Sequence, residues 1–200
     1  RRQRQMCIRD RHFHNHLEVG FCYYGEGTVT FKEDIPFDGN MFTVIPKNFP
    51  HTTTSAGDSV SYWEWLFIDA DKFLREVYKD NPRMAQKVLD RVNRRAHFVR
   101  VQDKPQIGAL AQQIIGCMRE RKEFYLEEVK GLTLALLLQV ARWNREEAEK
   151  TEFEAGNSSL ITPAIDYISE CCDRPIKVEE LAAMCHISET HLRRVFHDCM

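Results

Sequence analysis

The spacing of the apolar residues changes near Asp71, and that change limits the folds open to this chain. Before it, from residue 7 to about 70, short runs rich in β-branched and aromatic residues are separated by turn residues, which is typical of strands. After it, apolar residues recur three and four positions apart, which is typical of amphipathic helices. The sequence therefore predicts an α+β fold in which a small β-barrel or sandwich precedes a set of helices.

Glycines mark the turns between the predicted strands. Four of these strands are expected at residues 19–24, 28–31, 41–45 and 61–68. Gly25-Glu26-Gly27 separates the first two, so we expect a β-hairpin there. Asp38-Gly39 predicts a second turn before the third strand.

The middle of the chain predicts helices. Short helices are expected over 72–79 and 82–92, followed by an antiparallel pair of amphipathic helices over about 107–122 and 126–143. The apolar stripes of this pair consist of Ile107, Leu110, Ala111, Ile114 and Met118, and of Val129, Leu132, Leu136, Val140 and Trp143. The stripes extend further than one packing partner needs, so one interpretation is that they also contact a second partner. The alternative is that both helices pack only against their own β domain.

The last part of the chain predicts a linker and three helices. Residues 146–159 are charged and then rich in Gly, Asn and Ser, which is typical of a linker. In the segment 160–200, Thr162-Pro163 is expected to begin the first helix, Cys185-His186-Ile187 to form a tight turn, and Ser188 to cap the last helix. Two helices joined by a short turn can place one helix in a DNA major groove, although an ordinary three-helix unit with solvated arginines has the same pattern.

Three stretches of this segment favour DNA binding. They read Ile161-x-x-Ala164-x-x-Tyr167-Ile168, Pro175-Ile176-x-Val178-x-x-Leu181-Ala182 and Ile187-Ser188-x-x-x-Leu192-x-Arg194-x-Phe196. In order and spacing they strongly resemble the AraC/XylS family of bacterial transcription regulators. The resemblance implies operator DNA as a partner, with groove contacts at Thr190, Arg193 and Arg194. Because that family continues into a linking helix and a second helix-turn-helix, we expect 160–200 to be a truncated DNA-binding domain.

The charge of the segment departs from that of a typical DNA-binding unit. Residues 160–200 hold four Lys or Arg and seven Asp or Glu, a net charge of −3. A basic face usually supplies affinity by releasing counterions from DNA. We therefore expect this segment alone to bind operator DNA weakly.

Histidines gather at the start of the predicted β domain. Side chains two positions apart lie on the same face of a regular strand, so one face would hold His12, His14, His16 and Glu18. His51 follows later, as though on an opposite hairpin. Imidazole and carboxylate groups suit Zn, Ni or Fe(II). The alternatives are that the histidines bond a small effector or are structural.

The same residues resemble the two motifs of the cupin superfamily, in which His-x-His, Glu and a later His can ligate a metal. The resemblance implies that a divalent metal could be ligated by His12, His14, Glu18 and His51. Asn48 stands where the second motif usually has glycine, and Ser55 stands where it has asparagine. Regulators of the AraC type often carry a cupin-like sensor. Residues 1–145 are therefore expected to form an effector-binding domain with a cupin-like β-barrel, its dimerisation helices lying at about 107–145.

Two tryptophans extend the candidate site. Alternation places Trp63 and Trp65 on one face of their strand. An aromatic face with a few polar groups suits a sugar-like or aromatic effector, although we expect at least one of the two to serve core packing instead. The residues expected to bind the effector are His12, His14, His16, Glu18, His51, Trp63 and Trp65.

Three functions of different classes follow from these patterns. The leading one is a cytoplasmic, non-enzymatic transcription regulator that needs no cofactor, in which an effector in the barrel controls DNA binding by a homodimer. The second is a metal-dependent cupin enzyme with a helical appendage, and the third is an effector-binding protein that only dimerises.

The seven cysteines are odd in number and include no Cys-x-x-Cys, which favours reduced thiols in a cytoplasm. No apolar run approaches the length of a membrane span.

Overall fold

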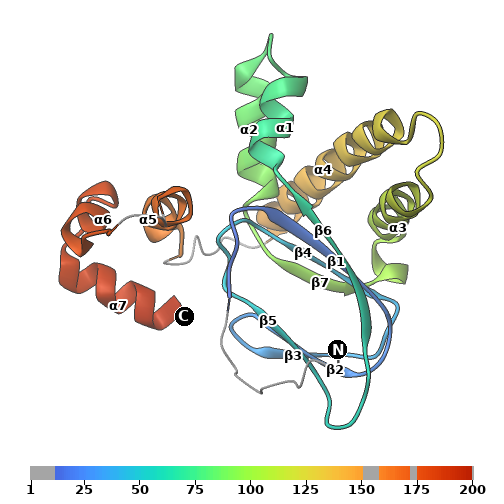
Figure 1. Ribbon diagram of the computed structural model, residues 1–200, viewed down its shortest axis with the longest axis horizontal. Coiled ribbons are helices and arrows are strands. Elements are labelled where there is room, and N and C mark those ends of the chain that lie inside the picture. The colour runs from blue at the N-terminus through green and yellow to red at the C-terminus, as the bar shows by residue number, and fades with distance from the viewer. Residues whose placement is uncertain (1–11, 151–157, 172–174, 200) are drawn as a thin grey trace.

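The computed structural model describes residues 12–150, 158–171 and 175–199 (Figure 1). Within these residues, seven strands form two antiparallel sheets, with the orders β6-β1-β4-β7 and β3-β2-β5. The strands are β1 (Leu17–Tyr24), β2 (Gly27–Thr30), β3 (Asp34–Phe37), β4 (Met41–Ile45), β5 (Thr52–Ser55), β6 (Tyr62–Ile68) and β7 (His97–Arg100). The expected α+β class is confirmed, because helices follow these strands.

Helices form most of the chain after β6. They are α1 (Ala70–Val77), α2 (Pro82–Val92), a 3-10 turn η1 (Val101–Asp103), α3 (Pro105–Glu120), α4 (Tyr125–Lys150), α5 (Ser158–Glu170), α6 (Val178–Met184) and α7 (Glu189–Cys199). The helix expected over 82–92 is confirmed, because Asn81 caps it by accepting the Met84 N–H at 3.1 Å. α1 begins two residues before the expected 72–79, because Asp69 accepts the Lys72 N–H and so fixes its start.

The hairpin expected around Gly25-Glu26-Gly27 is wrong. β1 pairs with β4 and β6, whereas β2 pairs with β3 and β5, so the chain passes from one sheet to the other at these glycines. Gly25 has a φ of 103°, and a Cβ there would lie 2.4 Å from Ser61 Cα, so no other residue fits this corner. The named strands pair only within their own sheets, and the described residues therefore do not form the closed barrel that was expected.

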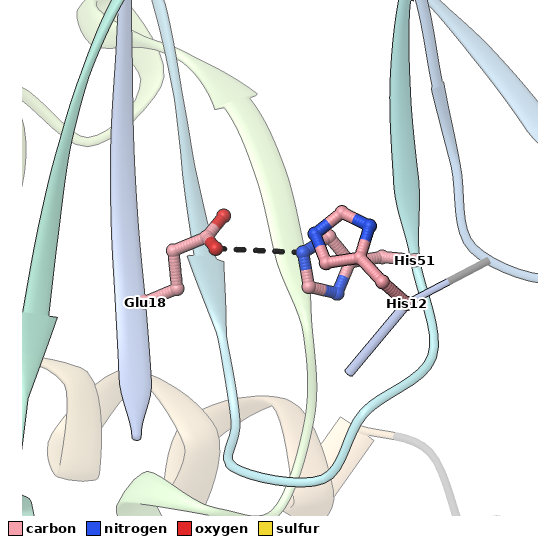
Figure 2. A group of neighbouring side chains, drawn as sticks. All are labelled: His12, Glu18 and His51. Atoms are coloured by element: carbon pink, nitrogen blue, oxygen red, sulfur yellow. Dashed lines mark ion pairs between the residues drawn. The ribbon is translucent and has the colours of Figure 1, made fainter. Parts of the chain in front are cut away.

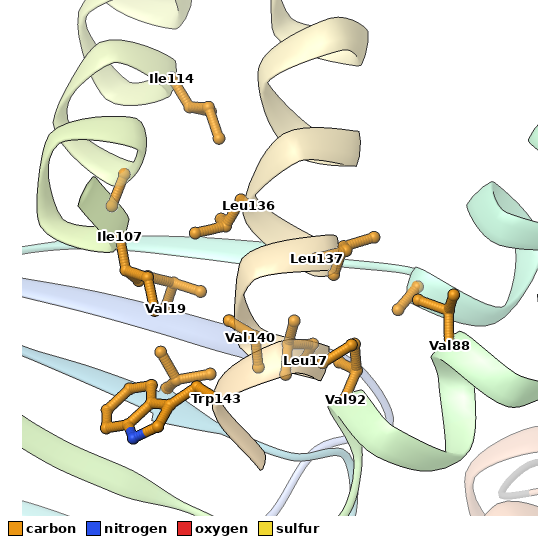
Figure 3. Close-up of a cluster of buried hydrophobic side chains, with 14 of the residues drawn as sticks. Leu17, Val19, Val88, Val92, Ile107, Ile114, Leu136, Leu137, Val140 and Trp143 are labelled. Atoms are coloured by element: carbon orange, nitrogen blue, oxygen red, sulfur yellow. The ribbon is translucent and has the colours of Figure 1, made fainter. Parts of the chain in front are cut away.

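The register gives the four-stranded sheet two different faces. One face packs against the helices, and β1 contributes to it Leu17, Val19 and Phe21, of which Figure 3 labels the first two. The residues that alternate with them are Glu18, Gly20 and Cys22, and these lie beside Phe67, Trp65 and Trp63 of β6, respectively. This second face is turned toward the three-stranded sheet, because Trp63 and Cys22 pack with Phe37 of β3.

The apolar stripes of α3 and α4 pack mainly within the chain. The buried members are Ile107, Ala111, Ile114, Leu136, Val140 and Trp143. Leu110, Val129 and Leu132 are half-buried against the same core. Packing within the chain's own core, formed by the sheet and the neighbouring helices, therefore accounts for most of the stripe. Met118, Phe124 and Leu126 remain exposed where the two helices meet.

Two expectations about the start of the C-terminal part need correction. α4 continues to Lys150, so residues 146–150 of the linker expected at 146–159 are helical, and residues 151–157 lie outside the described part of the chain. α5 begins at Ser158, so Pro163 lies inside the helix and not at its first position. Pro163 has no N–H to donate, so α5 forms around it with one fewer backbone hydrogen bond.

The turn between α6 and α7 forms as expected. His186 has a φ of 53°, and the Ile187 N–H donates to Ala182 O at 3.1 Å, which closes the end of α6. Ser188 caps α7, since its Oγ accepts the His191 N–H at 3.2 Å. α5, α6 and α7 enclose a core of their own, formed by Ile161, Ala164, Ile165, Leu181, Ala182, Cys185, Leu192 and Val195. None of the described helices is both long enough and apolar enough to cross a membrane.

Candidate functional site

Glu18 is a carboxylate buried in the four-stranded sheet and surrounded by histidines. The residue is 2% exposed. Its Oε2 lies 2.6 Å from His14 Nε2 and 3.4 Å from His51 Nε2. Figure 2 shows Glu18 reaching from β1 toward the rings of His12 and His51. We refer to His12, His14, Glu18 and His51 as the histidine cluster.

Hydrogen bonds to the backbone set the orientation of the rings. His12 and His51 form an isolated antiparallel bridge with N···O distances of 2.9 and 3.0 Å, which brings their ring centroids to 4.3 Å. The Nδ1 atom of His51 donates to Phe49 O at 2.8 Å, and that of His14 donates to His16 O at 2.9 Å. A carbonyl oxygen can only accept, so Nδ1 carries a proton in both rings and Nε2 is the atom that faces Glu18.

The cluster leaves buried polar atoms that a cation would satisfy. A neutral ring with its proton on Nδ1 presents a lone pair at Nε2, and a lone pair facing a carboxylate is repulsive unless a proton or a metal lies between them. Glu18 Oε1 and His51 Nε2 are buried without a hydrogen-bond partner among the described residues. One ligand atom each from His12, Glu18 and His51 lies within 4.8 Å of the other two. Two imidazoles and a carboxylate are thus placed where they fit a divalent metal.

Charge pairing dominates the electrostatics of the cluster. Burial alone would raise the pKa of Glu18, but the hydrogen bond with His14 and the electrostatic pairing with His51 and His14 outweigh it and lower this pKa to about 2. Burial acts to lower the pKa of His14, and the hydrogen bond with Glu18 outweighs it and raises that pKa. Burial and the nearby His51 lower the pKa of His12. Glu18 therefore stays ionised at neutral pH, and His12 favours the neutral form that binds metals.

The structure brings four of the predicted site residues together and leaves out His16. The chain becomes a regular strand only at Leu17, so the side chains of residues 12–16 need not alternate between the two faces of a sheet. His16 supports the cluster through its carbonyl, which accepts from His14. Within the described chain, no hydrogen bond or ring contact joins the His16 ring to the cluster.

Trp63 and Trp65 lie on the same face of β6, as alternation predicts. Their rings stack with centroids 4.9 Å apart and 5° between their planes. Trp63 also meets Phe37 edge-on, which fits the core-packing role expected for at least one tryptophan. Its Nε1 is nevertheless buried without a partner among the described residues. The register places Glu18 on this face too, so the aromatic pair and the histidine cluster line the same side of the sheet.

Gly20 determines where Trp65 can lie. A Cβ at position 20 would be 2.2 Å from Trp65 Cζ3 and 2.7 Å from Thr43 Oγ1. The substitution Gly20→Ala should therefore displace the stacked tryptophans and lower the free energy of unfolding by about 1–3 kcal/mol. Urea unfolding and near-ultraviolet circular dichroism would measure the two effects.

A matched control for this prediction is Gly116→Ala in α3, where a Cβ would meet nothing within 4 Å. Alanine is more favourable than glycine inside a helix, so this variant should keep the wild-type circular dichroism spectrum and be at least as stable as the wild type. A Gly20→Ala variant with the wild-type spectrum and stability would contradict the packing described.

Asn48 is a residue of the site whose role the sequence pattern only hinted at. It is 2% exposed and has a φ of 60°, a left-handed conformation that suits glycine or asparagine. This conformation explains why asparagine can stand where the cupin motif usually has glycine. The Asn48 N–H donates to His14 O at 2.7 Å and so holds the cluster in place.

The residues expected to contact DNA lie at exposed positions of α7. Thr190, Arg193 and Arg194 are exposed, whereas Leu192 and Val195 are buried in the core of α5–α7. The Arg193 side chain is 66% exposed, with Nη2 3.9 Å from Glu189 Oε2. Their spacing of three and four residues puts the three side chains on one accessible face of a capped helix.

Comparison with known proteins identifies a family and a fold. Residues 3–137 match the family model described as AraC-like ligand binding domain. An apo ToxT variant from Vibrio cholerae strain SCE256 superposes with a TM-score of 0.53 at 10% identity, over 95% of this chain and 69% of that chain. Vibrio cholerae ToxT bound to (E)-4-(8-methylnaphthalen-1-yl)but-3-enoic acid gives 0.52 at 10% identity, over 94% and 70%. The AraC-like transcriptional activator CuxR gives 0.42 at 14% identity, over 92% and 61%. No curated protein matches the sequence significantly.

Proposed function

Because this chain belongs to the family of AraC-like ligand-binding domains, we propose that it is part of a transcription regulator whose binding to operator DNA is controlled by a small effector in the N-terminal domain. The observation that carries the proposal is Glu18, a buried carboxylate whose Oε1 has no partner among the described residues. Buried acceptors are rarely left unpaired, so a donor group of a ligand is expected to meet it.

The chemistry of the site favours an uncharged effector with hydroxyl groups. Hydroxyls can donate to Glu18 Oε1 and accept from Trp63 Nε1, and the stacked Trp63 and Trp65 suit the face of a sugar-like ring. One ToxT structure holds an aromatic carboxylic acid. In this chain, a carboxylate placed at the cluster would be repelled by the ionised Glu18. We therefore propose a sugar-like effector bound by the histidine cluster and the two tryptophans.

We propose that α7 reads the operator through Thr190, Arg193 and Arg194. Their exposure on a helix that follows a short turn supports this role. The segment 160–200 has a net charge of −3, so further phosphate contacts must come from a second copy or from elsewhere in the protein. A homodimer through 107–122 and 126–143 would supply the second copy, and the exposed Met118 and Leu126 offer an apolar patch for it.

The experiment that tests the proposed function is the enrichment of DNA duplexes of random sequence by the full-length protein. The wild type should enrich a defined sequence. If Arg193 or Arg194 reads a base, its replacement by alanine should cost about 1–3 kcal/mol in binding and remove the preference at one base pair. An arginine that contacts only phosphate should instead weaken all sequences alike.

The matched control is Arg83→Ala, because Arg83 is exposed on α2 and lies outside the proposed DNA-binding helix. This variant should enrich the wild-type sequence with unchanged affinity. Unchanged enrichment after replacement of both Arg193 and Arg194 would remove α7 from the recognition role.

A divalent metal is a second candidate ligand for the same site. It is favoured by the convergence of His12, Glu18 and His51, and by the unpartnered Glu18 Oε1 and His51 Nε2. Zn, Ni or Fe(II) would suit these ligands, with His14 pairing the other Glu18 oxygen. Calorimetric titration of chelator-treated protein with Zn²⁺ should show one site that Glu18→Gln abolishes and His186→Ala leaves intact. Turnover by the metal-loaded protein would instead support the metal-dependent enzyme.

A further inference from the structure

The outward side of α2 carries a row of basic side chains. Arg83, Lys87 and Arg91 follow one another four positions apart, so they lie along one side of the helix, and Arg94 follows in the turn after it. We refer to these four residues as the basic row. Arg91 is half-buried and the other three are exposed. The side of α2 that packs in the core holds different residues, namely Ala85, Val88, Leu89 and Val92.

The charges of the basic row are not neutralised within the described chain. Residues 82–95 hold five Lys or Arg and one Asp, a net charge of +4, although the whole chain has a net charge of −2. That one carboxylate, Asp90, accepts from Gln86 Nε2 at 2.7 Å. Among the residues that the structure describes, no member of the row forms an ion pair, whereas the neighbouring Arg95 pairs with Glu147 at 3.0 Å. The row therefore presents positive charge that a partner can neutralise.

The composition of this surface suits a polyanion better than a protein. In residues 82–95, all of which the structure describes, no large apolar side chain is exposed. The centre of a protein interface is usually apolar or aromatic, whereas Lys and Arg make most contacts with the phosphates of DNA. Charge complementarity thus favours the DNA backbone as the partner of the basic row.

One end of the basic row lies near the helices that include the proposed DNA-binding helix. Asn93 follows the last residue of α2, and its Oδ1 accepts from the Lys47 N–H at 3.4 Å. The side chain of the same lysine donates to Asp166 Oδ2 on α5 at 3.2 Å. Lys47 thus contacts both the end of α2 and α5, so Arg94, the residue after Asn93, lies near α5.

We propose that Lys87, Arg91 and Arg94 contact the phosphates of DNA that flanks the sequence read by α7. The inference rests on the proposed function, and it adds phosphate contacts to those of the segment 160–200, whose net charge is −3. Phosphate contacts fix the position of a protein on the duplex and carry no information about base sequence. The basic row therefore adds affinity, and the choice of sequence stays with α7.

The test is the dissociation constant of the full-length protein for two duplexes, measured over a series of salt concentrations. One duplex carries the enriched sequence with flanking base pairs, and the other is a scrambled duplex of the same length. Lys87→Gln and Arg94→Gln each remove one charge of the basic row. Each should lower the slope of log Kd against log salt by about 0.9 and weaken binding at physiological salt about fivefold on both duplexes. The sequence that the protein enriches should not change.

The matched control is Arg83→Gln, which removes the same charge from the same side of α2. Arg83 lies about three helical turns, or ~16 Å, before Arg94 and therefore further from α5. The proposed contact predicts that this variant keeps the wild-type slope and affinity. If the row acted only through the net charge of the protein, Arg83→Gln would lower the slope as much as Arg94→Gln, and the proposed contact would be overturned.

The outcomes separate this inference from the proposed function. If the wild type enriches no sequence but Lys87→Gln and Arg94→Gln still lower the slope on the scrambled duplex, operator reading by α7 fails and the phosphate contact stands. If a sequence is enriched and both variants keep the wild-type slope, the phosphate contact is overturned. Salt-dependent binding of polyglutamate that both variants lose would then assign the basic row to an acidic protein instead.

Discussion

Replacing Glu18 by glutamine should lower the free energy of unfolding by about 3 kcal/mol in slightly acidic, chelator-treated solution. Glutamine keeps the size of the side chain but loses the charge that pairs with His14 Nε2 at 2.6 Å in a buried site. The pKa of Glu18, about 2 instead of 4.5, corresponds to the same magnitude, about 3 kcal/mol. Urea unfolding of the wild type and the variant would measure the difference.

The effect of Glu18→Gln should depend on pH in both directions. The pKa of Glu18 is lower in the fold, so its stabilisation is present above pH 4.5 and is lost as the pH falls toward 2. The pKa of His14 is raised above 6.5, so its stabilisation is present below pH 6.5 and is lost as the pH rises through the folded value. The difference between wild type and variant should therefore be largest between these limits and shrink on either side.

Glu120→Gln is the matched control for this substitution. Glu120 pairs with Lys122, but the two side chains are 57% and 79% exposed. An exposed pair contributes at most about 1 kcal/mol, so the variant should be nearly as stable as the wild type. A cost at Glu18 no larger than the cost at Glu120, with no dependence on pH, would contradict the cluster as described.

Leu137→Ala should lower the free energy of unfolding by about 3–5 kcal/mol. Leu137 is completely buried, and Figure 3 shows it pointing from α4 toward Val88 of α2. Removing its side chain leaves a cavity between two helices that pack within one chain. Thermal or urea unfolding would measure the loss, which should not depend on protein concentration. Leu126→Ala is the control, because Leu126 is 50% exposed and should cost less than about 1 kcal/mol.

The two variants also separate folding from association. If α4 served only to pair two chains, Leu137→Ala would change the sedimentation coefficient and leave the stability of each chain intact, which would contradict the packing in Figure 3. A charged residue in place of the exposed Met118 is expected to have the opposite effects to Leu137→Ala. Met118→Glu should weaken association and leave unfolding unchanged.

The parts of the fold that depend on neighbouring residues follow from the sequence. α2 has the expected bounds because Asn81 and Pro82 act on the first turn of the helix they precede. The turn at His186 and the cap at Ser188 are local in the same way. Strand pairing is not local. Gly25 and Gly27 suited a hairpin equally well, but the 103° φ of Gly25 turns the chain into a second sheet.

The candidate site could be predicted only in part for the same reason. The alternation of side chains along a strand correctly placed Glu18 on the face shared with the tryptophans, since β1 is regular from Leu17 onward. The same rule failed for His16, because the chain before Leu17 is held by individual hydrogen bonds and not by a ladder. Nothing in the spacing of Phe13 distinguishes it from an ordinary strand residue, and only the packed structure shows that it joins the core of α5–α7.

The central claim is that the histidine cluster controls DNA binding, and one measurement tests it most directly. That measurement is the dissociation constant of the full-length protein for its enriched duplex, with Zn²⁺ and with a chelator, in the wild type and in Glu18→Gln. A coupling of 1–3 kcal/mol predicts a change of about fivefold or more in the wild type and no change in the variant. Equal constants in the wild type under both conditions, with Zn²⁺ shown by calorimetry to occupy the cluster, would contradict the claim.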